Sequence, residues 1–340
     1  MPGTVVVETV EGRALAANTL GDPSVRRVAV WLPPSYATAA ARRYPVIYWL
    51  AGYAGTGESL FHGNPWQPGL GDRLDRLVER GAMGEVIVVA PDGFTRWGGS
   101  QYLDSPVSGG YERHVCREVV PEIDRRFRTS TAREARAIGG KSSGGFGALV
   151  LAMRHPELFA AVASHAGDMY FELSILPDVP VAVRTLRRHG GVAGFLQHFD
   201  HALTKRSDDF TTIMMLALAA AYSPDAERPH GVALPFHLGT GELDHDVWRR
   251  WKAWDPIELA AKHAEALRAM KLVYLDAGTR DEHALDLGAR ILAARLAALG
   301  VAFRHEEFDD GHRGTAYRYD VSLPLLAAAI GAAPETHAHG

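Results

Sequence analysis

The stretch AIGGKSSGGFGALVLAMRHP, residues 137–156, carries the strongest structural signal in the chain. An apolar run leads into a cluster of small residues, and a second apolar segment follows them. This order predicts a strand, a tight turn and a helix. The turn Gly140-Lys141-Ser142-Ser143-Gly144 matches G-x-S-x-G, which presents a nucleophilic serine. Its first three residues also match the end of a phosphate-binding P-loop, so two chemistries compete.

Spacing separates the two chemistries. A P-loop needs a glycine five residues before Gly140, because successive backbone amides must wrap the phosphates. Ala135 stands there, inside the expected strand, and excludes that pattern. A serine turn needs small neighbours on both sides, and the flanking glycines meet this need. The helix starting near Gly144 would direct its N-terminal amides toward Ser142, where they stabilise negative charge on a substrate oxygen.

A serine hydroxyl is a weak nucleophile until a base removes its proton, and an acid must orient that base. In sheets with this turn the chain order is serine, acid, histidine, with the last two directly after strands. Asp281 follows the expected strand 271–277, and His312 follows the expected strand 301–308. We therefore predict Ser142 as nucleophile, Asp281 as orienting acid and His312 as base.

Other acidic and histidine residues nearby have different expected roles. Asp276 lies within the strand and is expected to be structural. Glu282 and His283 are expected to open the next helix, where an acidic residue is common. His305 lies inside its own strand, without a reason to reach the serine turn. The remaining candidates fall in a helix or in the turn before Gly311: Asp286, Asp309 and Asp310.

An oxyanion hole needs two backbone donors. The residue after the nucleophile, Ser143, supplies the first. The second is expected in the glycine-rich loop 51–55 that follows strand 44–50, where we assign Tyr53 with Gly52 as the alternative. Gly52 is also expected to contact substrate, as are three residues of the long loop 92–112, for which surface packing is an equal alternative: Trp97, Gln101 and Tyr102.

Short β-rich runs alternate with helical patterns, which predicts an α/β fold with a mostly parallel sheet and helices on both faces. Residues 168–255 turn helix-rich and are too long for a loop, so we predict a helical cap inserted into the core, which comprises 1–167 and 256–332. Residues 333–340 are expected to be a disordered tail. The expected strands are 26–32, 44–50, 85–91, 134–140, 159–165, 271–277 and 301–308; the expected helices are 70–80, 111–126, 145–154, 257–269, 282–299 and 315–331.

Composition narrows the classes of partner. The 340 residues are 47% hydrophobic and 22% charged, with a formal net charge of −4, which is typical of a globular protein and gives no reason to expect nucleic acid. No signal peptide or membrane-spanning run is evident, and Cys116, the only cysteine, excludes an internal disulfide. We expect a cytoplasmic protein with a small-molecule ester as ligand and no membrane partner; a homodimer is left open.

No metal or cofactor is expected for this chemistry. Four residues of the predicted cap resemble a metal set by type alone, and their spacing matches no zinc pattern: His198, His201, His245 and Asp246. We interpret them as solvated cap residues. Trp248, Trp251 and Trp254 share a helical face, which favours a packing seam over an aromatic binding site.

With these pieces placed, residues 26–326 outside the cap resemble the esterase D-like branch of the α/β-hydrolases. That group includes S-formylglutathione hydrolases, feruloyl and acetylxylan esterases, enterochelin esterases and mycolyl transferases. Ser142, Asp281 and His312 stand at the group's nucleophile, acid and base positions. The sequence departs from the group at Ala51, where relatives have His or Ser, and at Ser143, where Met, Leu or Gln is common. The resemblance rests on VWLPPSY, YPVIYWLAGYAGTG, VVAPDG, GGSQYLDS, GKSSGGFGALVLAMRHPELFAAVASHAGD, LDAGTRDEH and DDGHRGTAYRY.

These observations predict a serine hydrolase that acts on carboxylic esters through a covalent acyl-enzyme. Two alternatives stay open at this point. An acyltransferase of the same fold would use an alcohol where the hydrolase uses water. A catalytically inactive binding protein would keep the fold without the reaction.

Overall fold

The structure is a computed structural model that describes residues 2–333. Its centre is an eight-stranded sheet with the order β1-β2-β4-β3-β7-β8-β9-β10. β1, β2 and β4 pair antiparallel, and every pair from β4 to β10 across the rest of the sheet is parallel. A separate hairpin joins β5 to β6. The strands are β1 (Thr4–Glu11), β2 (Val25–Leu32), β3 (Val46–Leu50), β4 (Ile87–Pro91), β5 (Asp104–Ser105), β6 (Gly109–Gly110), β7 (Arg136–Lys141), β8 (Ala161–His165), β9 (Leu272–Gly278) and β10 (Arg304–Phe308).

Helices cover both faces of the sheet. Side chains of α1 and α13 pack on one face, and those of α3, α4, α10 and α12 build the larger core on the other. The predicted α/β class is thereby confirmed. The helices are α1 (Leu70–Glu79), α2 (Tyr111–Arg113), α3 (Val120–Arg126), α4 (Ser143–Arg154), α5 (Phe171–Ser174), α6 (Val179–Arg188), α7 (Val192–His201), α8 (Ser207–Tyr222), α9 (His245–Lys252), α10 (Pro256–Lys262), α11 (Ala264–Arg268), α12 (Leu285–Ala298) and α13 (Tyr319–Ala329).

Each predicted strand overlaps an observed one, and β1 is an additional strand that the sequence analysis missed. β1 lies at the edge of the sheet, and among its residues only Val10 is buried although Val5, Val6 and Val7 form an apolar run. The helix predicted over 257–269 is two helices divided at His263, whose φ is −116°. The helix predicted from residue 282 begins at Leu285, because the Asp281 carboxylate binds the amide of His283 in a turn.

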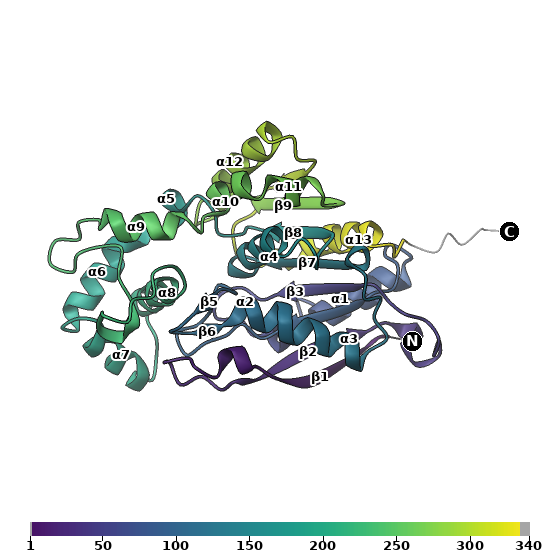
Figure 1. Ribbon diagram of the computed structural model, residues 1–340, viewed down its shortest axis with the longest axis horizontal. Helices are drawn as coiled ribbons and strands as arrows, with labels where there is room; N and C mark the ends of the chain where they lie inside the picture. Colours follow the sequence, from purple (N-terminus) through teal and green to yellow (C-terminus); the bar gives the residue numbers. More distant parts are fainter. Residues whose placement is uncertain (1, 334–340) are drawn as a thin grey trace.

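Residues 168–255 contain α5 to α9, and Figure 1 shows α6, α7, α8 and α9 grouped to the left of the sheet. α8 is largely buried along its length, and its Tyr222 packs against Phe146 of α4. Trp251 is fully buried and donates its indole N–H to Ser223 at 2.7 Å, so the tryptophans 248 and 251 are packing residues. None of the described helices is both long and apolar enough to cross a membrane. The tail expected at 333–340 lies outside the described residues, except for Ala333.

The parallel strands bring the loops that follow them to one edge of the sheet. The loop after β3 contains Tyr53, the turn after β7 contains Ser142, and the segment after β8 enters the helical region at residue 168. Asp281 follows β9, and His312 follows β10. Because carboxyl ends of parallel strands meet at the same edge, residues far apart in sequence become neighbours there.

Gly144 permits the close approach of α4 to β3. A Cβ atom at this position would lie 2.1 Å from the carbonyl oxygen of Leu50 and 2.7 Å from that of Ala51. Neither oxygen belongs to a flexible side chain, so a larger residue would force the backbone apart. The turn before α4 therefore depends on glycine here.

We predict that Gly144→Ala lowers the free energy of unfolding by about 1–3 kcal/mol, because the added methyl group displaces main-chain atoms. Urea denaturation measures the loss. Gly239→Ala is the matched control, since a Cβ there has no heavy atom within 4 Å, and we expect a change within about 1 kcal/mol. Equal effects of the two substitutions would contradict this account.

Candidate active site

Ser142 lies between β7 and α4 as the N-cap residue, with φ 56° and ψ −125°. A positive φ is unfavourable for a residue with a side chain and persists only where the surroundings hold it. The Ser142 amide donates to the carbonyl of His165 in β8 at 2.9 Å, and its carbonyl accepts the amide of Phe146 at 2.9 Å. The backbone thus fixes the serine at the tip of a sharp turn, with the side chain partly exposed.

Asp281 and His312 form a hydrogen-bonded pair. The Nδ1 of His312 lies 2.8 Å from Oδ2 of Asp281, and the other carboxylate oxygen accepts the His283 amide at 2.9 Å. Burial alone would raise the pKa of Asp281, but the hydrogen bond and charge of His312 outweigh it, and the pKa is lowered. The carboxylate therefore stays ionised and favours the tautomer of His312 with a proton on Nδ1, which leaves Nε2 as a base.

The serine is near this pair without being bonded to it. Ser142 and His283 line the same pocket, and the rings of His283 and His312 meet edge to face at 5.0 Å between centroids. Within residues 2–333 the Ser142 hydroxyl has no hydrogen-bond partner. The structure therefore brings the three predicted residues to one edge of the sheet, joins Asp281 to His312, and leaves the hydroxyl of Ser142 unpaired.

The backbone of His312 is held from both sides by charged groups. The Nζ of Lys141 donates to the carbonyl oxygen of His312 at 2.5 Å, and Oε2 of Glu282 accepts the His312 amide at 2.7 Å. Burial lowers the pKa of Lys141, although Asp281, Glu282 and other nearby carboxylates oppose that shift. The His312 amide lowers the pKa of Glu282. We call Lys141 and Glu282 the His312 clamp.

Sequence reasoning missed the His312 clamp. Glu282 was expected to open a helix, and Lys141 was treated only as the variable position of the serine turn. Both residues could have been found by their position, because each is the immediate neighbour of a predicted triad residue. The pairing across more than 150 residues between Lys141 and His312 follows only from β7 and β10 ending at the same edge.

Two backbone amides near Ser142 are free to bind an oxyanion. Tyr53 lies in the turn after β3, and its amide has no acceptor among the described residues. Ser143 is the first residue of α4, where a helix amide lacks an intrahelical partner. Gly52 adjoins the same turn, since a Cβ there would lie 3.5 Å from Cβ of Ser142. Both predicted donors are thus placed beside the serine.

A pocket of about 50 Å³ opens beside Ser142. Its wall combines core residues with apolar side chains from the helical region. Asp168 is a carboxyl in this wall, held by the Gln101 amide at 3.1 Å and near the Ser143 hydroxyl at 3.4 Å. Burial raises the pKa of Asp168. The residues that line the pocket are Tyr53, Ser142, Ser143, Asp168, Ser174, Ile175, Met214, Leu218 and His283.

The three predicted substrate contacts of loop 92–112 do not line this pocket. Trp97, Gln101 and Tyr102 are each at most 5% exposed. Trp97 accepts a hydrogen bond from the Tyr53 hydroxyl at its carbonyl, and the Tyr102 hydroxyl donates to Ala51 at 2.9 Å. Gln101 instead binds Asp168, and the Trp97 carbonyl and the Tyr102 hydroxyl bind residues of the loop after β3.

The core contains a second chain of aspartate, histidine and serine. Asp276 Oδ1 lies 2.7 Å from Nδ1 of His165, whose Nε2 lies 2.7 Å from the Ser322 hydroxyl. All three are at most 3% exposed, and Ser322 sits inside α13. Asp276 also binds Arg318 at 3.0 Å. A substrate carbonyl has no access there, so this chain is a structural network that ties β8, β9 and α13 together.

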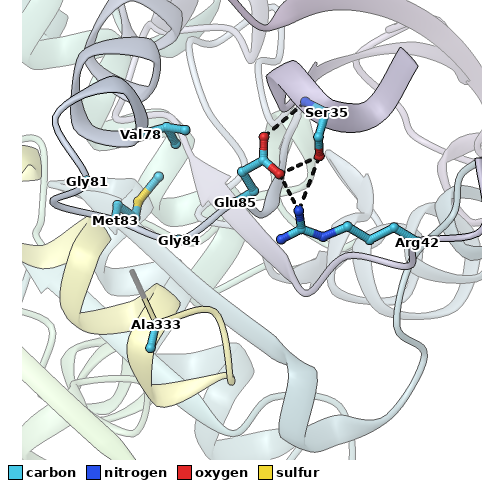
Figure 2. A pocket seen from close by; sticks show the side chains of 8 residues that line it. All are labelled: Ser35, Arg42, Val78, Gly81, Met83, Gly84, Glu85 and Ala333. Atoms are coloured by element: carbon cyan, nitrogen blue, oxygen red, sulfur yellow. Dashed lines mark hydrogen bonds and ion pairs between the residues drawn. The ribbon is translucent and has the colours of Figure 1, made fainter. Parts of the chain in front are cut away.

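A larger cavity lies at the opposite edge of the sheet, and Figure 2 shows its lining. It adjoins the residues that precede β3 and β4, so it is remote from the strand ends that present Ser142. Its polar groups satisfy one another: Glu85 accepts from the Ser35 amide at 2.9 Å and from Arg42 at 2.7 Å (Figure 2). We interpret it as structural.

Comparison with known proteins identifies the family of this chain. The family model described as "Putative esterase" matches residues 23–321. An esterase of Mycobacterium tuberculosis is 34% identical over 147 residues, which cover 41% of this chain and 28% of that protein. An endo-1,4-beta-xylanase/feruloyl esterase of Xylanibacter ruminicola is 29% identical over 144 residues, 42% of this chain and 19% of that protein. The chain thus spans less than a third of the length of these relatives.

Solved structures share the fold across nearly the whole chain. A ferulic acid esterase superposes with a TM-score of 0.62 at 20% identity, covering 96% of this chain and 99% of the other. An S-formylglutathione hydrolase from Agrobacterium tumefaciens gives 0.61 at 19% identity, covering 97% and 96%. Both have the α/β-hydrolase fold that the sheet order predicts. Because the family model matches most of this chain, the chain belongs to the esterase family of α/β-hydrolases.

Proposed function

We propose that this protein hydrolyses carboxylic esters through a covalent acyl group on Ser142. The observation that carries the proposal is the strained turn at Ser142, partly exposed at the same sheet edge as the bonded pair Asp281 and His312. The family supports esterase chemistry, and the accessible position distinguishes this serine from the buried Ser322.

In the proposed reaction, Nε2 of His312 takes the proton of the Ser142 hydroxyl while the oxygen attacks the ester carbonyl. The tetrahedral oxyanion binds the amides of Tyr53 and Ser143, and loss of either donor would cost about 3 kcal/mol of transition-state stabilisation. The imidazolium then protonates the leaving alcohol. Water attacks the acyl group with His312 again as base, and Ser142 regains its proton. None of these steps requires a metal or an organic cofactor.

The unpaired Ser142 hydroxyl is compatible with this reaction. Hydrogen bonds between nucleophile and base are often long in unliganded enzymes and shorten when substrate binds. The His312 clamp holds the main chain of the base, so the remaining adjustment is a rotation of the serine side chain or the imidazole. Lys141 and Glu282 therefore act as positioning residues in the proposal.

The pocket favours esters with a short acyl group. Its volume is small, and Met214 and Leu218 of α8 together with Ile175 close it with apolar side chains. An ordered apolar wall binds a methyl or ethyl group well and clashes with a long chain. The proposed ligand is thus a small-molecule ester whose acyl part is compact.

We predict that Ser142→Ala and Asp281→Asn each lower kcat/KM for p-nitrophenyl acetate by a factor on the order of 10⁴. The first substitution removes the nucleophile, and the second removes the carboxylate that holds His312 in the correct tautomer. Circular dichroism should show an unchanged fold. Covalent labelling by a fluorophosphonate should disappear in Ser142→Ala.

Ser322→Ala is the matched control, since it removes the serine of the buried aspartate–histidine chain. It should retain labelling and turnover at 25 °C, with reduced thermal stability. Full ester turnover in Ser142→Ala would contradict the proposal, as would loss of turnover in a folded Ser322→Ala.

The His312 clamp predicts opposite pH effects. Lys141→Met removes a positive charge beside His312, so the acidic limb of kcat/KM should move to higher pH. Glu282→Gln removes a negative charge while keeping an oxygen acceptor, so the limb should move to lower pH. Rate–pH profiles of the two variants measure both shifts.

Arg313→Met is the control for this pair, because Arg313 is an exposed charge adjacent in sequence to His312 and solvent screens it. Its acidic limb should stay in place. Shifts of the same sign in Lys141→Met and Glu282→Gln would show that the clamp residues act through the fold alone.

For acyl length, we predict rates on p-nitrophenyl esters that fall at least about tenfold from acetate to octanoate. Met214→Ala should recover most of the octanoate rate by enlarging the pocket. Leu173→Ala, on an exposed position of α5 outside the pocket, should leave the chain-length profile unchanged. A flat profile in the parent protein would contradict the pocket assignment.

A further inference from the structure

Three ligand-type side chains meet in the helical region, away from Ser142. His189 follows α6, His198 lies on α7 and Asp209 lies in the first turn of α8. One ligand atom from each lies within 4.8 Å of the other two. The sequence analysis weighed His198 with His201, and the fold instead places it beside His189 and Asp209. His201 binds the carbonyl of Gln197 on its own helix at 2.7 Å.

The distance between His198 and Asp209 is unusual for an aspartate–histidine pair. Nε2 of His198 lies 3.4 Å from Oδ1 of Asp209, whereas the pairs at His312 and His165 are separated by 2.8 and 2.7 Å. The longer separation exceeds a normal hydrogen bond. It equals the separation of two ligand atoms around a tetrahedral zinc ion with bonds near 2.05 Å, which is about 3.4 Å.

Asp209 is held in an orientation that suits a metal ligand. It is 2% exposed, and its Oδ2 accepts a hydrogen bond from the Arg206 amide at 2.9 Å at the start of α8. That bond occupies one carboxylate oxygen and directs the other, Oδ1, toward His198. Oδ1 is thus the oxygen of this carboxylate that a cation beside His198 would meet.

The two imidazoles lie against each other. Their rings stack with centroids 4.1 Å apart and planes 20° apart. A neutral imidazole binds a metal through a ring nitrogen, so this contact brings two ligand groups together.

We propose that His189, His198 and Asp209 form a three-ligand site for a divalent zinc ion, with water as the fourth ligand. Two nitrogens and one carboxylate oxygen are donors that zinc accepts. Binding requires one stacked ring to turn about its Cβ–Cγ bond, so that both nitrogens point to the ion. Both residues are partly exposed.

A metal here would add a link among three helices, two of which are already joined by the exposed ion pair of Arg188 and Asp208 at 3.4 Å. It would connect the end of α6, α7 and the start of α8, and α8 carries Met214 and Leu218 of the pocket wall. The site would therefore stabilise the helical region. It stands apart from the ester chemistry and does not depend on the proposed function.

The test is calorimetric titration of ZnCl₂ into the full chain after removal of metals with a chelator. We expect one ion per chain and a thermal midpoint that rises with zinc. His189→Ala and His198→Ala should each weaken binding at least about tenfold. Asp209→Asn should do the same while keeping an oxygen for the Arg206 amide.

His201→Ala is the matched control on the same helix and should bind zinc as the parent does. Absence of stoichiometric binding in the parent would overturn the proposal. So would parent-like affinity in the folded His189→Ala and His198→Ala variants, because the ion would then occupy another site.

Discussion

The backbone conformation of Ser142 is the constraint on which the rest of the site depends. A residue with a side chain stays at positive φ only if its neighbours prevent relaxation. Here β8 binds its amide, α4 begins directly after it, and Gly144 lets that helix approach Leu50 of β3. The same packing leaves the amides of Tyr53 and Ser143 without an acceptor among the described residues. The serine, its exposure and these two amides thus come from one packing arrangement of β3, β7, β8 and α4.

Hydrogen-bond pattern alone does not identify a catalytic site in this protein. Asp276, His165 and Ser322 form a more completely bonded chain than the residues at the sheet edge. They lie in the core, where the bonds satisfy buried polar groups and join the last strands to α13. At the edge, the side chains of Ser142 and His312 are partly exposed, whereas the Asp281 carboxylate is buried. Accessibility and local strain, rather than the number of bonds, therefore distinguish reactive groups from structural ones.

The main chain of His312 is held by charged side chains, whereas the backbone of Ser142 is held by packing. His312 lies in a loop beyond β10 without helix or strand bonds to hold it. Lys141 and Glu282 bind its carbonyl and amide, and both are adjacent in sequence to triad residues. The helical region adds the apolar wall of the pocket, and the carboxyl of Asp168 supplies its one acidic side chain. The sheet edge thus supplies the polar residues of the site, and the helices of residues 168–255 supply the apolar wall of its pocket.

Local periodicity and small residues were enough to predict the α/β class, the inner strands and the serine turn. They also predicted that Asp281 and His312 follow strands, as they do. The burial of Trp97, Gln101 and Tyr102 and the approach of Lys141 to His312 could not be predicted in this way. Those features depend on which distant segments meet, and neither residue type nor spacing encodes that contact directly.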